Sequence, residues 1–186
     1  TPLRESSMTM ADADQDGALD FFLMGEDASG SPKTDLYLNE GLPNGFAVTS
    51  PTDDVSRGAI GFGDFNDDAN GRIDVFITGQ SGTNATDRLT RIYAGSGAGS
   101  FVPEPLASDP IADANNFSAA AWGDYDNDGK LDLLLAGRTD DTPTRALRLY
   151  RNVEGTANLE PTAPSSLQVS ASGVFANFSW DASVDP

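Results

Sequence analysis

Short apolar runs, separated by polar and glycine-rich segments, dominate the chain. Residues 21–24, 75–78 and 133–136 are mostly apolar, and a glycine follows each run, which is typical of strands that are buried on both faces of a sheet. Residues 36–38 and 147–150 tend towards alternation of apolar and polar positions, as in a more exposed strand. No stretch combines a helical period with capping residues. The pattern therefore predicts an all-β protein.

These segments belong to a repeat of roughly 56 residues, present in three copies. In each copy an aspartate-rich loop precedes the apolar run and ends in a closing aspartate. A glycine, a tyrosine in a second apolar segment, a turn rich in Gly and Asn and a final apolar residue then follow in the same order. Because four features recur together, we interpret them as one structural unit. The closing aspartates are Asp20, Asp74 and Asp132, the glycines Gly25, Gly79 and Gly137, the tyrosines Tyr37, Tyr93 and Tyr150, and the final residues Phe46, Phe101 and Leu159.

Each copy predicts four strands. One lies before the acidic loop, two form a hairpin across a polar connector, and one lies near the final apolar residue. Four short strands in a repeat of this length are typical of a β-propeller blade. Three blades cannot close a ring, and the chain opens with Thr1 instead of Met, so we expect it to be a piece of a longer protein and part of a larger propeller. The expected blades are residues 8–50, 58–106 and 117–159, within a first region of residues 1–159.

Residues 160–186 differ in character from the repeats. A Pro-rich linker at 160–164 precedes two segments of alternating polarity, 166–170 and 175–180, and the second ends in Trp180. This order resembles the start of a fibronectin type III domain, a β-sandwich with a buried tryptophan. The resemblance implies the opening strands of a C-terminal sandwich, with Trp180 in its core.

Composition narrows the possible functions. The chain has 29 acidic and 11 basic residues and a formal net charge of −18, which disfavours nucleic acid and anionic membranes as partners and favours cations. It contains no cysteine and no histidine, which removes disulfides, zinc-thiolate sites and histidine-based catalysis. No apolar run approaches the roughly 18–20 residues that a membrane span needs, so we expect no membrane insertion.

The first and third acidic loops carry the candidate chemistry. Loop 1 (residues 12–20) and loop 3 (residues 124–132) both read Asp-x-Asp-x-Asp-Gly-x-Leu-Asp. Calcium prefers about six to eight oxygen ligands, mainly carboxylates and carbonyls, and the glycine permits the sharp turn that brings alternate carboxylates together. The residue after the glycine can offer its main-chain carbonyl. The expected ligands are Asp12, Asp14, Asp16, Ala18 and Asp20 in loop 1, and Asp124, Asp126, Asp128, Lys130 and Asp132 in loop 3.

Two other interpretations fit these loops less well. A solvated acidic turn is common where Asp and Gly occur together, but four carboxylates within nine residues repel one another unless a cation lies among them. An EF-hand requires flanking helices and a glutamate at position 12, where this chain has Leu23 and Leu135. We therefore expect Ca²⁺ in loops 1 and 3.

Loop 2 (residues 64–74) departs from the pattern. Counted from Asp64, the series continues through Asn66 and Asp68 and reaches its glycine two residues late; counted from Asn66, it includes Asn70 and Asp74 but loses a carboxylate. Both alignments leave a looser or less charged site, so a third Ca²⁺ in this loop would bind most weakly.

The segments that flank the acidic loops resemble a known repeat family. Phe62-Gly-Asp-Phe-Asn and Trp122-Gly-Asp-Tyr-Asp before the loops, and Leu149-Tyr-Arg-Asn152 after the third hairpin, resemble the FG-GAP/VCBS repeats of integrin-α-like β-propellers. The resemblance extends over residues 8 to about 160. It implies a structural Ca²⁺ in each blade, held by the acidic positions of the three loops, in a ring of six or seven blades.

The resemblance implies a non-catalytic, calcium-stabilised extracellular module for adhesion or for binding a protein or glycan ligand. Its other partners would be the missing blades of the same propeller, and its location the surface or exterior of a bacterial cell. Two alternatives stay open. The chain could be an accessory or catalytic part of a secreted polysaccharide-degrading enzyme, or a passive spacer.

Overall fold

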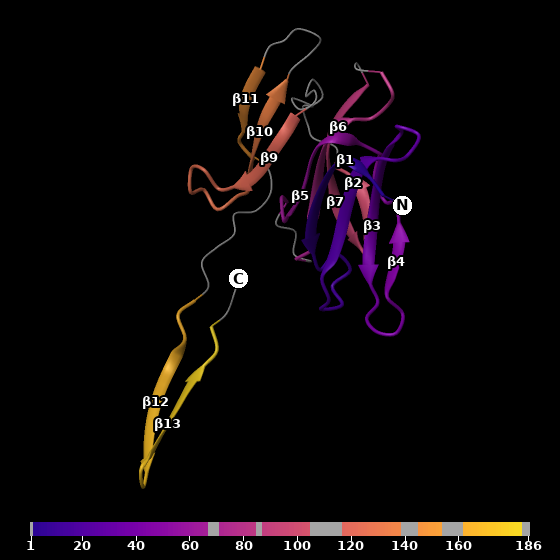
Figure 1. Cartoon of the computed structure of the whole chain (residues 1–186). Coiled ribbons are helices and arrows are strands. Elements are labelled where there is room, and N and C mark those ends of the chain that lie inside the picture. The colour runs from indigo at the N-terminus through magenta and orange to yellow at the C-terminus, as the bar shows by residue number, and fades with distance from the viewer. Residues whose placement is uncertain are drawn as a thin grey trace. The chain divides into compact units, whose positions relative to one another are not determined.

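The computed structural model describes residues 2–66, 71–84, 87–104, 117–138, 145–153 and 162–183. Within these residues every element is a β-strand and every sheet is antiparallel (Figure 1), which confirms the predicted all-β class. The chain divides into two compact units, Thr1–Thr156 and Ala157–Pro186. The described part of the chain contains no helix long and apolar enough to cross a membrane.

The first unit contains one sheet for each copy of the repeat. The predicted arrangement is confirmed in sheets 1 and 2, because the acidic loop joins the first two strands, the hairpin comes next and the short fourth strand carries Phe46 or Phe101. In sheet 3 the strand predicted near Leu159 lies outside the described residues. Sheet 1 comprises β1 (Arg4–Ala11), β2 (Asp20–Glu26), β3 (Pro32–Asn39) and β4 (Phe46–Thr49); sheet 2 comprises β5 (Ser56–Gly63), β6 (Asp74–Gln80), β7 (Arg88–Gly97) and β8 (Ser100–Pro103); sheet 3 comprises β9 (Phe117–Gly123), β10 (Asp132–Arg138) and β11 (Arg145–Tyr150).

The three sheets share one register. In each hairpin the recurring tyrosine pairs with the residue directly after the closing aspartate. The opposite partner of that residue is the large apolar side chain two positions before loop 1, 2 or 3. The repeat detected in the sequence is thus a repeat of strand pairing. The paired residues are Met10, Phe21 and Tyr37 in sheet 1, Phe62, Val75 and Tyr93 in sheet 2, and Trp122, Leu133 and Tyr150 in sheet 3.

The core lies between consecutive sheets. Phe22 of sheet 1 and Ile77 of sheet 2 belong to one buried cluster, whereas Phe76, on the other face of β6, packs with Leu133 and Leu135 of sheet 3. Neighbouring residues of a strand point to opposite faces, so the continuous apolar run of β6 serves two cores. This confirms the sequence interpretation of residues 75–78 as a strand buried on both faces. The same interpretation is wrong for residues 133–136, because the face of β10 that carries Leu134 is not covered by described residues.

One face of sheet 3 has no such cover among the described residues. Leu134 and Leu149 are directly paired across β10 and β11, and Leu147 pairs with Ala136 on the same face. The exposed fractions are 38% for Leu134, 70% for Leu147 and 46% for Leu149. These three leucines form the open face of sheet 3.

The recurring glycine has a steric cause. The first strand of sheet 2 bulges between Ser56 and Ala59, which brings its backbone against β6. A Cβ placed on Gly79 would lie 2.3 Å from the carbonyl oxygen of Ser56. Sheet 1 repeats this geometry, because a Cβ on Gly25 would lie 2.8 Å from the carbonyl oxygen of Arg4. Only glycine leaves room for the bulged strand.

The second unit contains one hairpin, β12 (Ser165–Ser172) and β13 (Phe175–Asp181). Both strands were predicted from their alternation. Trp180 was expected in a core, and this expectation is wrong for the described unit, since 59% of its surface is exposed. Burial in a sandwich requires a second sheet, and the described residues of this unit supply only one. The fibronectin-like assignment stays a prediction.

Candidate metal centres

Loops 1 and 3 have the same backbone conformation. Gln15 and Gly17 adopt positive φ angles of 65° and 90°, and the equivalent Asn127 and Gly129 adopt 57° and 83°. This left-handed region suits Gly and Asn, and it curls the chain sharply. The spacing of aspartate and glycine that the two loops share therefore produces the same curl twice.

The first aspartate of each loop organises that curl. In loop 1 the Asp12 carboxylate accepts hydrogen bonds from the backbone N–H groups of Asp16 and Gly17 at 3.0 and 2.9 Å, and Asp16 Oδ1 accepts one from Ala18 N–H at 2.7 Å. Carboxylates commonly bind nearby backbone donors in this way. Loop 3 repeats the three bonds, from Asp128 N–H and Gly129 N–H to Asp124 at 3.1 and 3.0 Å, and from Lys130 N–H to Asp128 at 3.1 Å.

Ala18 and Lys130 were expected to offer main-chain carbonyls to a metal. The contacts of these two residues in loops 1 and 3 run through their N–H groups. The carbonyl role stays a prediction.

The closing aspartate is a buried residue whose carboxylate joins the acidic loop to the end of the hairpin, and we call this arrangement the clamp. Asp20 is 0% exposed, and its two oxygens accept hydrogen bonds from Ala13 N–H and Asn39 N–H, both at 2.8 Å. It thereby joins the start of loop 1 to the end of β3. The sequence pattern predicts this residue only as a metal ligand, so its role in joining two segments of the chain is an additional finding. The clamp recurs at Asp74, which binds Phe65 N–H and Asn66 N–H at 2.8 and 3.3 Å and Gly95 N–H at 3.0 Å, and at Asp132, which binds Tyr125 N–H at 3.1 Å and Asn152 N–H at 2.7 Å.

The sequence of loop 2 contains a signal for this second role of the closing aspartate. Loop 2 keeps its closing aspartate although the rest of its pattern departs from loops 1 and 3. A residue needed only as a ligand would have less reason to persist in the least regular loop. Its persistence points to a role that does not depend on the metal shell.

Carboxylate oxygens converge in loops 1 and 3. One oxygen from each of Asp12, Asp14 and Asp20 lies within 4.8 Å of the others, and the same holds for Asp124, Asp126 and Asp128. Two oxygens on opposite sides of a Ca²⁺ ion, each about 2.3–2.6 Å from it, are about 4.6–5.2 Å apart. Both groups therefore fit around a single ion. Asp16 falls outside the first convergent group, and Asp132 falls outside the second.

Loop 1 holds its negative charges close together and partly away from water. Burial raises the pKa of Asp14, and the neighbouring carboxylates of Asp20 and Asp16 raise it further. A divalent cation at this point would relieve the repulsion that these groups exert on one another. The electrostatics thus agree with the fit by distance.

Loop 2 is described only in part. Asp64 and Asn66 precede the gap in the described residues and Asp74 follows it, while Asp68 and Asn70 lie outside them. The clamp of Asp74 is present, so this repeat shares the framework of the other two. Whether its oxygens converge on an ion stays a prediction.

The ends of neighbouring repeats are joined near the acidic loops. Gln15 Nε2 of loop 1 donates a hydrogen bond to the Gly71 carbonyl of loop 2 at 3.2 Å. Asn152 Nδ2, just beyond β11, donates one to the Phe65 carbonyl of loop 2 at 2.8 Å. The loops therefore lie at the same end of consecutive sheets, and residues of the first and third repeats both help to hold loop 2.

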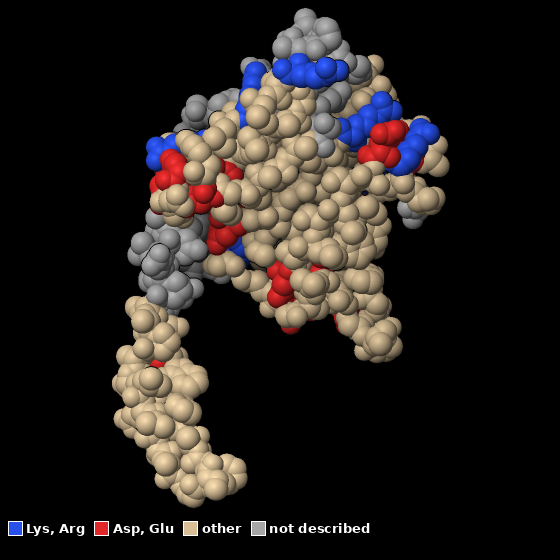
Figure 2. Space-filling model, turned by 60° about the vertical axis from the view of Figure 1, so that its left-hand side comes forward, with Lys and Arg blue, Asp and Glu red and all other residues tan. Residues whose placement is uncertain are grey.

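Arg151 lies over loop 3, a contact that the sequence analysis missed. Its Nε donates to Asp126 Oδ2 at 2.5 Å and its terminal nitrogen donates to Asp128 Oδ2 at 2.9 Å. The hydrogen bond to Asp126 is the main cause of a raised pKa for Arg151. On the face shown in Figure 2, acidic and basic side chains lie in small groups with uncharged surface between them.

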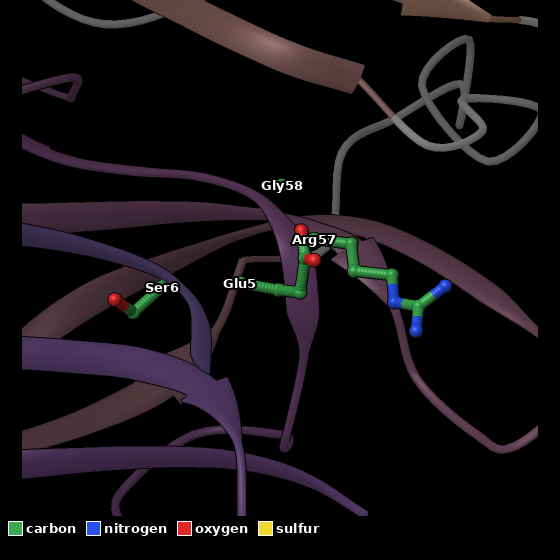
Figure 3. Close-up of a pocket in the computed structure, with 4 residues that line it drawn as sticks. All are labelled: Glu5, Ser6, Arg57 and Gly58. Atoms are coloured by element: carbon green, nitrogen blue, oxygen red, sulfur yellow. The ribbon is translucent and has the colours of Figure 1, made fainter. Parts of the chain in front are cut away.

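A second charged group lies at the bulged ends of β1 and β5. Buried Glu26 accepts hydrogen bonds from Arg4 at 3.1 Å and from Arg57 at 2.6 Å, and the bond from Arg57 lowers the pKa of the Glu26 carboxyl. Beside it, Glu5, Ser6, Arg57 and Gly58 line an open cavity of about 280 Å³, in which the Arg57 side chain extends away from Ser6 (Figure 3). Since Arg57 belongs to sheet 2 and Glu26 to sheet 1, this ion pair joins the two sheets.

Comparison with known families agrees with this geometry. Residues 68–135 match the family of FG-GAP-like repeats. The match begins in loop 2, includes the hairpin of sheet 2 and loop 3, and ends in β10. No match to a curated protein was found.

FG-GAP-like repeats are typical of extracellular proteins. The resemblance inferred from the sequence is thus confirmed over residues 68–135. Its extension to the whole of the first unit, and to a closed propeller, stays a prediction.

Proposed function

We propose that this chain is a calcium-stabilised, extracellular repeat module for adhesion or ligand binding, without catalytic activity of its own. The observation that carries the proposal is the convergence of three carboxylate oxygens within 4.8 Å in both loop 1 and loop 3. Each loop presents hard oxygen donors on a curled backbone, the donor set that Ca²⁺ prefers. The match to FG-GAP-like repeats supports the same function.

Bound calcium would stabilise the folded chain. Because each loop joins the first two strands of its sheet, an ion in the loop favours the folded chain over the unfolded one. A ligand that binds only the native state stabilises it by about 2.7 kcal/mol when its free concentration is 100 times its Kd. Extracellular calcium sites have Kd values on the order of 10⁻⁴ to 10⁻³ M, so calcium at about 1 mM, roughly one to ten times the Kd, would stabilise the module by about 0.4–1.4 kcal/mol per ion.

The partner is proposed to be a protein or a glycan, together with further sheets of the same kind. The open face of sheet 3 supports the second part, because alternate residues of β2 and of β6 in sheets 1 and 2 already pack against the following sheet. We propose that Leu134 and its neighbours on this face pack against a further blade of a larger propeller. The expected surroundings are the exterior of a bacterial cell.

An experiment on the purified chain tests the calcium part. After treatment with EDTA, calorimetric titration with CaCl₂ should show Ca²⁺ bound in loops 1 and 3, and the thermal midpoint should rise. MgCl₂ should have a much smaller effect, because Mg²⁺ keeps its waters. Asp14→Asn and Asp126→Asn should each remove one ion, whereas Asp181→Asn, an exposed residue of the second unit, serves as the matched control. A midpoint unaffected by calcium, with no heat of binding, would refute the proposal.

A second experiment separates a binding module from the alternatives. Binding to a panel of glycans and extracellular proteins, in calcium and in EDTA, should reveal a ligand that is not altered chemically. Turnover of a bound polysaccharide would instead support the enzyme alternative. Absence of both binding and turnover would favour a spacer.

A further inference from the structure

The clamp of the closing aspartate aligns one position in all three repeats. Asn39, Gly95 and Asn152 each donate their backbone N–H to the closing aspartate of their own repeat. The residues directly before them are therefore equivalent, although they lie far from loops 1, 2 and 3 in the sequence. They are Leu38, Ala94 and Arg151.

These equivalent residues give loops 1 and 3 different surroundings. Leu38 packs against the apolar core between sheets 1 and 2. Arg151 instead forms ion pairs with Asp126 and Asp128, two of the three residues whose oxygens converge in loop 3. In the described part of the chain, no lysine or arginine forms an ion pair with an aspartate of loop 1.

Arg151 is held at this point from both sides. It follows β11 directly, and the next residue, Asn152, is fixed through its backbone to Asp132 and through its side chain to the carbonyl of Phe65. The side chain spans the gap between Asp126 and Asp128, with each ion pair made to an Oδ2 atom. The guanidinium thus neutralises two of the three carboxylates that a metal ion in loop 3 would use.

We propose that Arg151 is a built-in competitor of the metal in loop 3, so that loop 1 binds calcium more tightly and fills first. The inference rests on the proposed calcium function and concerns the order in which loops 1 and 3 fill. A Ca²⁺ ion in loop 3 must either displace the guanidinium from two oxygens or remain close to a like charge, and both cost free energy. In loop 1, whose aspartates form no ion pair with a described lysine or arginine, an ion relieves the full repulsion between the carboxylates.

The ion pairs of Arg151 also predict that loops 1 and 3 differ in order when no calcium is bound. The ion pairs of Arg151 hold the carboxylates of loop 3 together when no calcium is present. Among the described residues, no lysine or arginine gives loop 1 such a substitute, so it gains more order from calcium than loop 3 does. The two loops would therefore respond to different calcium concentrations, although their nine-residue pattern is the same.

The test compares loops 1 and 3 by calorimetric titration with CaCl₂. Of these two loops, Asp14→Asn leaves loop 3 intact and Asp126→Asn leaves loop 1 intact, while loop 2 is the same in both variants. We expect the Kd of loop 3 to be higher by about threefold to tenfold, the order expected for two half-exposed ion pairs. Adding Arg151→Gln to the Asp14→Asn chain should lower the Kd of loop 3 by a similar factor, whereas Arg151→Lys should leave it nearly unchanged.

The controls keep the outcomes distinct. Arg91→Gln removes the same charge from a half-exposed arginine that pairs with Asp53, away from the three loops, and should not alter the Kd. Terbium emission sensitised by Tyr125, which lies within loop 3, gives a second readout. Equal Kd values for loops 1 and 3, or weaker binding after Arg151→Gln, would overturn the inference and leave the calcium function intact. No calcium binding in any variant would instead refute the proposed function.

Discussion

Asp132 accepts a hydrogen bond from the backbone N–H of Asn152 at 2.7 Å, which ties the first residue of β10 to the end of the hairpin that β10 forms with β11. Its other oxygen accepts one from Tyr125 N–H in loop 3 at 3.1 Å. The same pair of contacts occurs at Asp20 and Asp74. The last aspartate of each acidic loop therefore stabilises the fold whether or not a metal is bound.

This role predicts that two aspartates of loop 1 differ in their dependence on calcium. Asp20→Asn places an amide where a buried carboxylate accepts two backbone hydrogen bonds, and it should lower the free energy of unfolding by about 1–3 kcal/mol. The loss should be present in EDTA as well as in calcium. Asp14→Asn, in a half-buried ligand position, should lower stability only in calcium. Urea denaturation under both conditions measures the difference, and a loss for Asp20→Asn that disappears in EDTA would contradict the clamp.

The bulge in β5 predicts that replacing Gly79 in sheet 2 with a larger residue lowers stability. Gly79→Ala would place a methyl group 2.3 Å from the Ser56 carbonyl oxygen and should cost about 1–3 kcal/mol or more through overpacking. Gly123→Ala is the matched control, since its added Cβ would meet no atom within 4 Å, and it should change stability by less than about 0.5 kcal/mol. Thermal unfolding of both variants checks this, and equal midpoints would show that the strands separate easily.

Tyr93 predicts a loss of stability at alkaline pH. Burial, together with a hydrogen bond to Asp53, raises the pKa of the Tyr93 hydroxyl from 10.0 to about 12. A group whose pKa is higher in the folded chain contributes fully below its unfolded pKa, and its contribution is lost as pH rises from 10 to about 12. Stability measured by urea denaturation should fall across this window.

Tyr93→Phe should be less stable near pH 7, by about 0.5–1.5 kcal/mol for the lost hydrogen bond, but should decline less between pH 10 and 12. Tyr37→Phe, at the equivalent position of sheet 1, serves as the control and should decline like the unaltered chain. The same decline in all three proteins would argue against Tyr93 as the titrating group.

The open face of sheet 3 predicts self-association of the isolated chain. Leu147 and Leu149 expose 70% and 46% of their surfaces beside Leu134, and contiguous apolar surface of this kind promotes association. Leu147→Lys combined with Leu149→Lys should lower the average mass measured by light scattering at high protein concentration. Leu42→Lys, at an isolated exposed leucine, should not. A monomer at all concentrations would contradict this prediction.

Several features could be predicted from the sequence because they depend on neighbouring residues. The apolar run of β6 indicated a strand buried on both faces, and the nine-residue spacing of loops 1 and 3 indicated two equivalent curled loops. The order of loop, hairpin and fourth strand followed from turn residues in the same way. In each case the physical cause, side-chain alternation or a left-handed turn, acts over a few residues.

The burial of Trp180 could not be predicted in this way. Its alternating surroundings indicate a strand, and β13 is one, but burial depends on a second sheet that alternation does not specify. The sequence showed that a glycine recurs at this position but not why. The reason is a bulge in β5 that crowds Gly79, and β5 is another strand.

The sequence by itself determined an all-β chain of repeats with acidic loops, since strand period and loop spacing are local properties. The tertiary structure determined which residues contact those loops. It placed Arg151 on Asp126 and Asp128, and it brought Asn152 to Asp132, through contacts between residues about twenty positions apart. Such contacts depend on how a hairpin folds back over its own loop, and for that reason two loops with the same pattern acquired unequal surroundings.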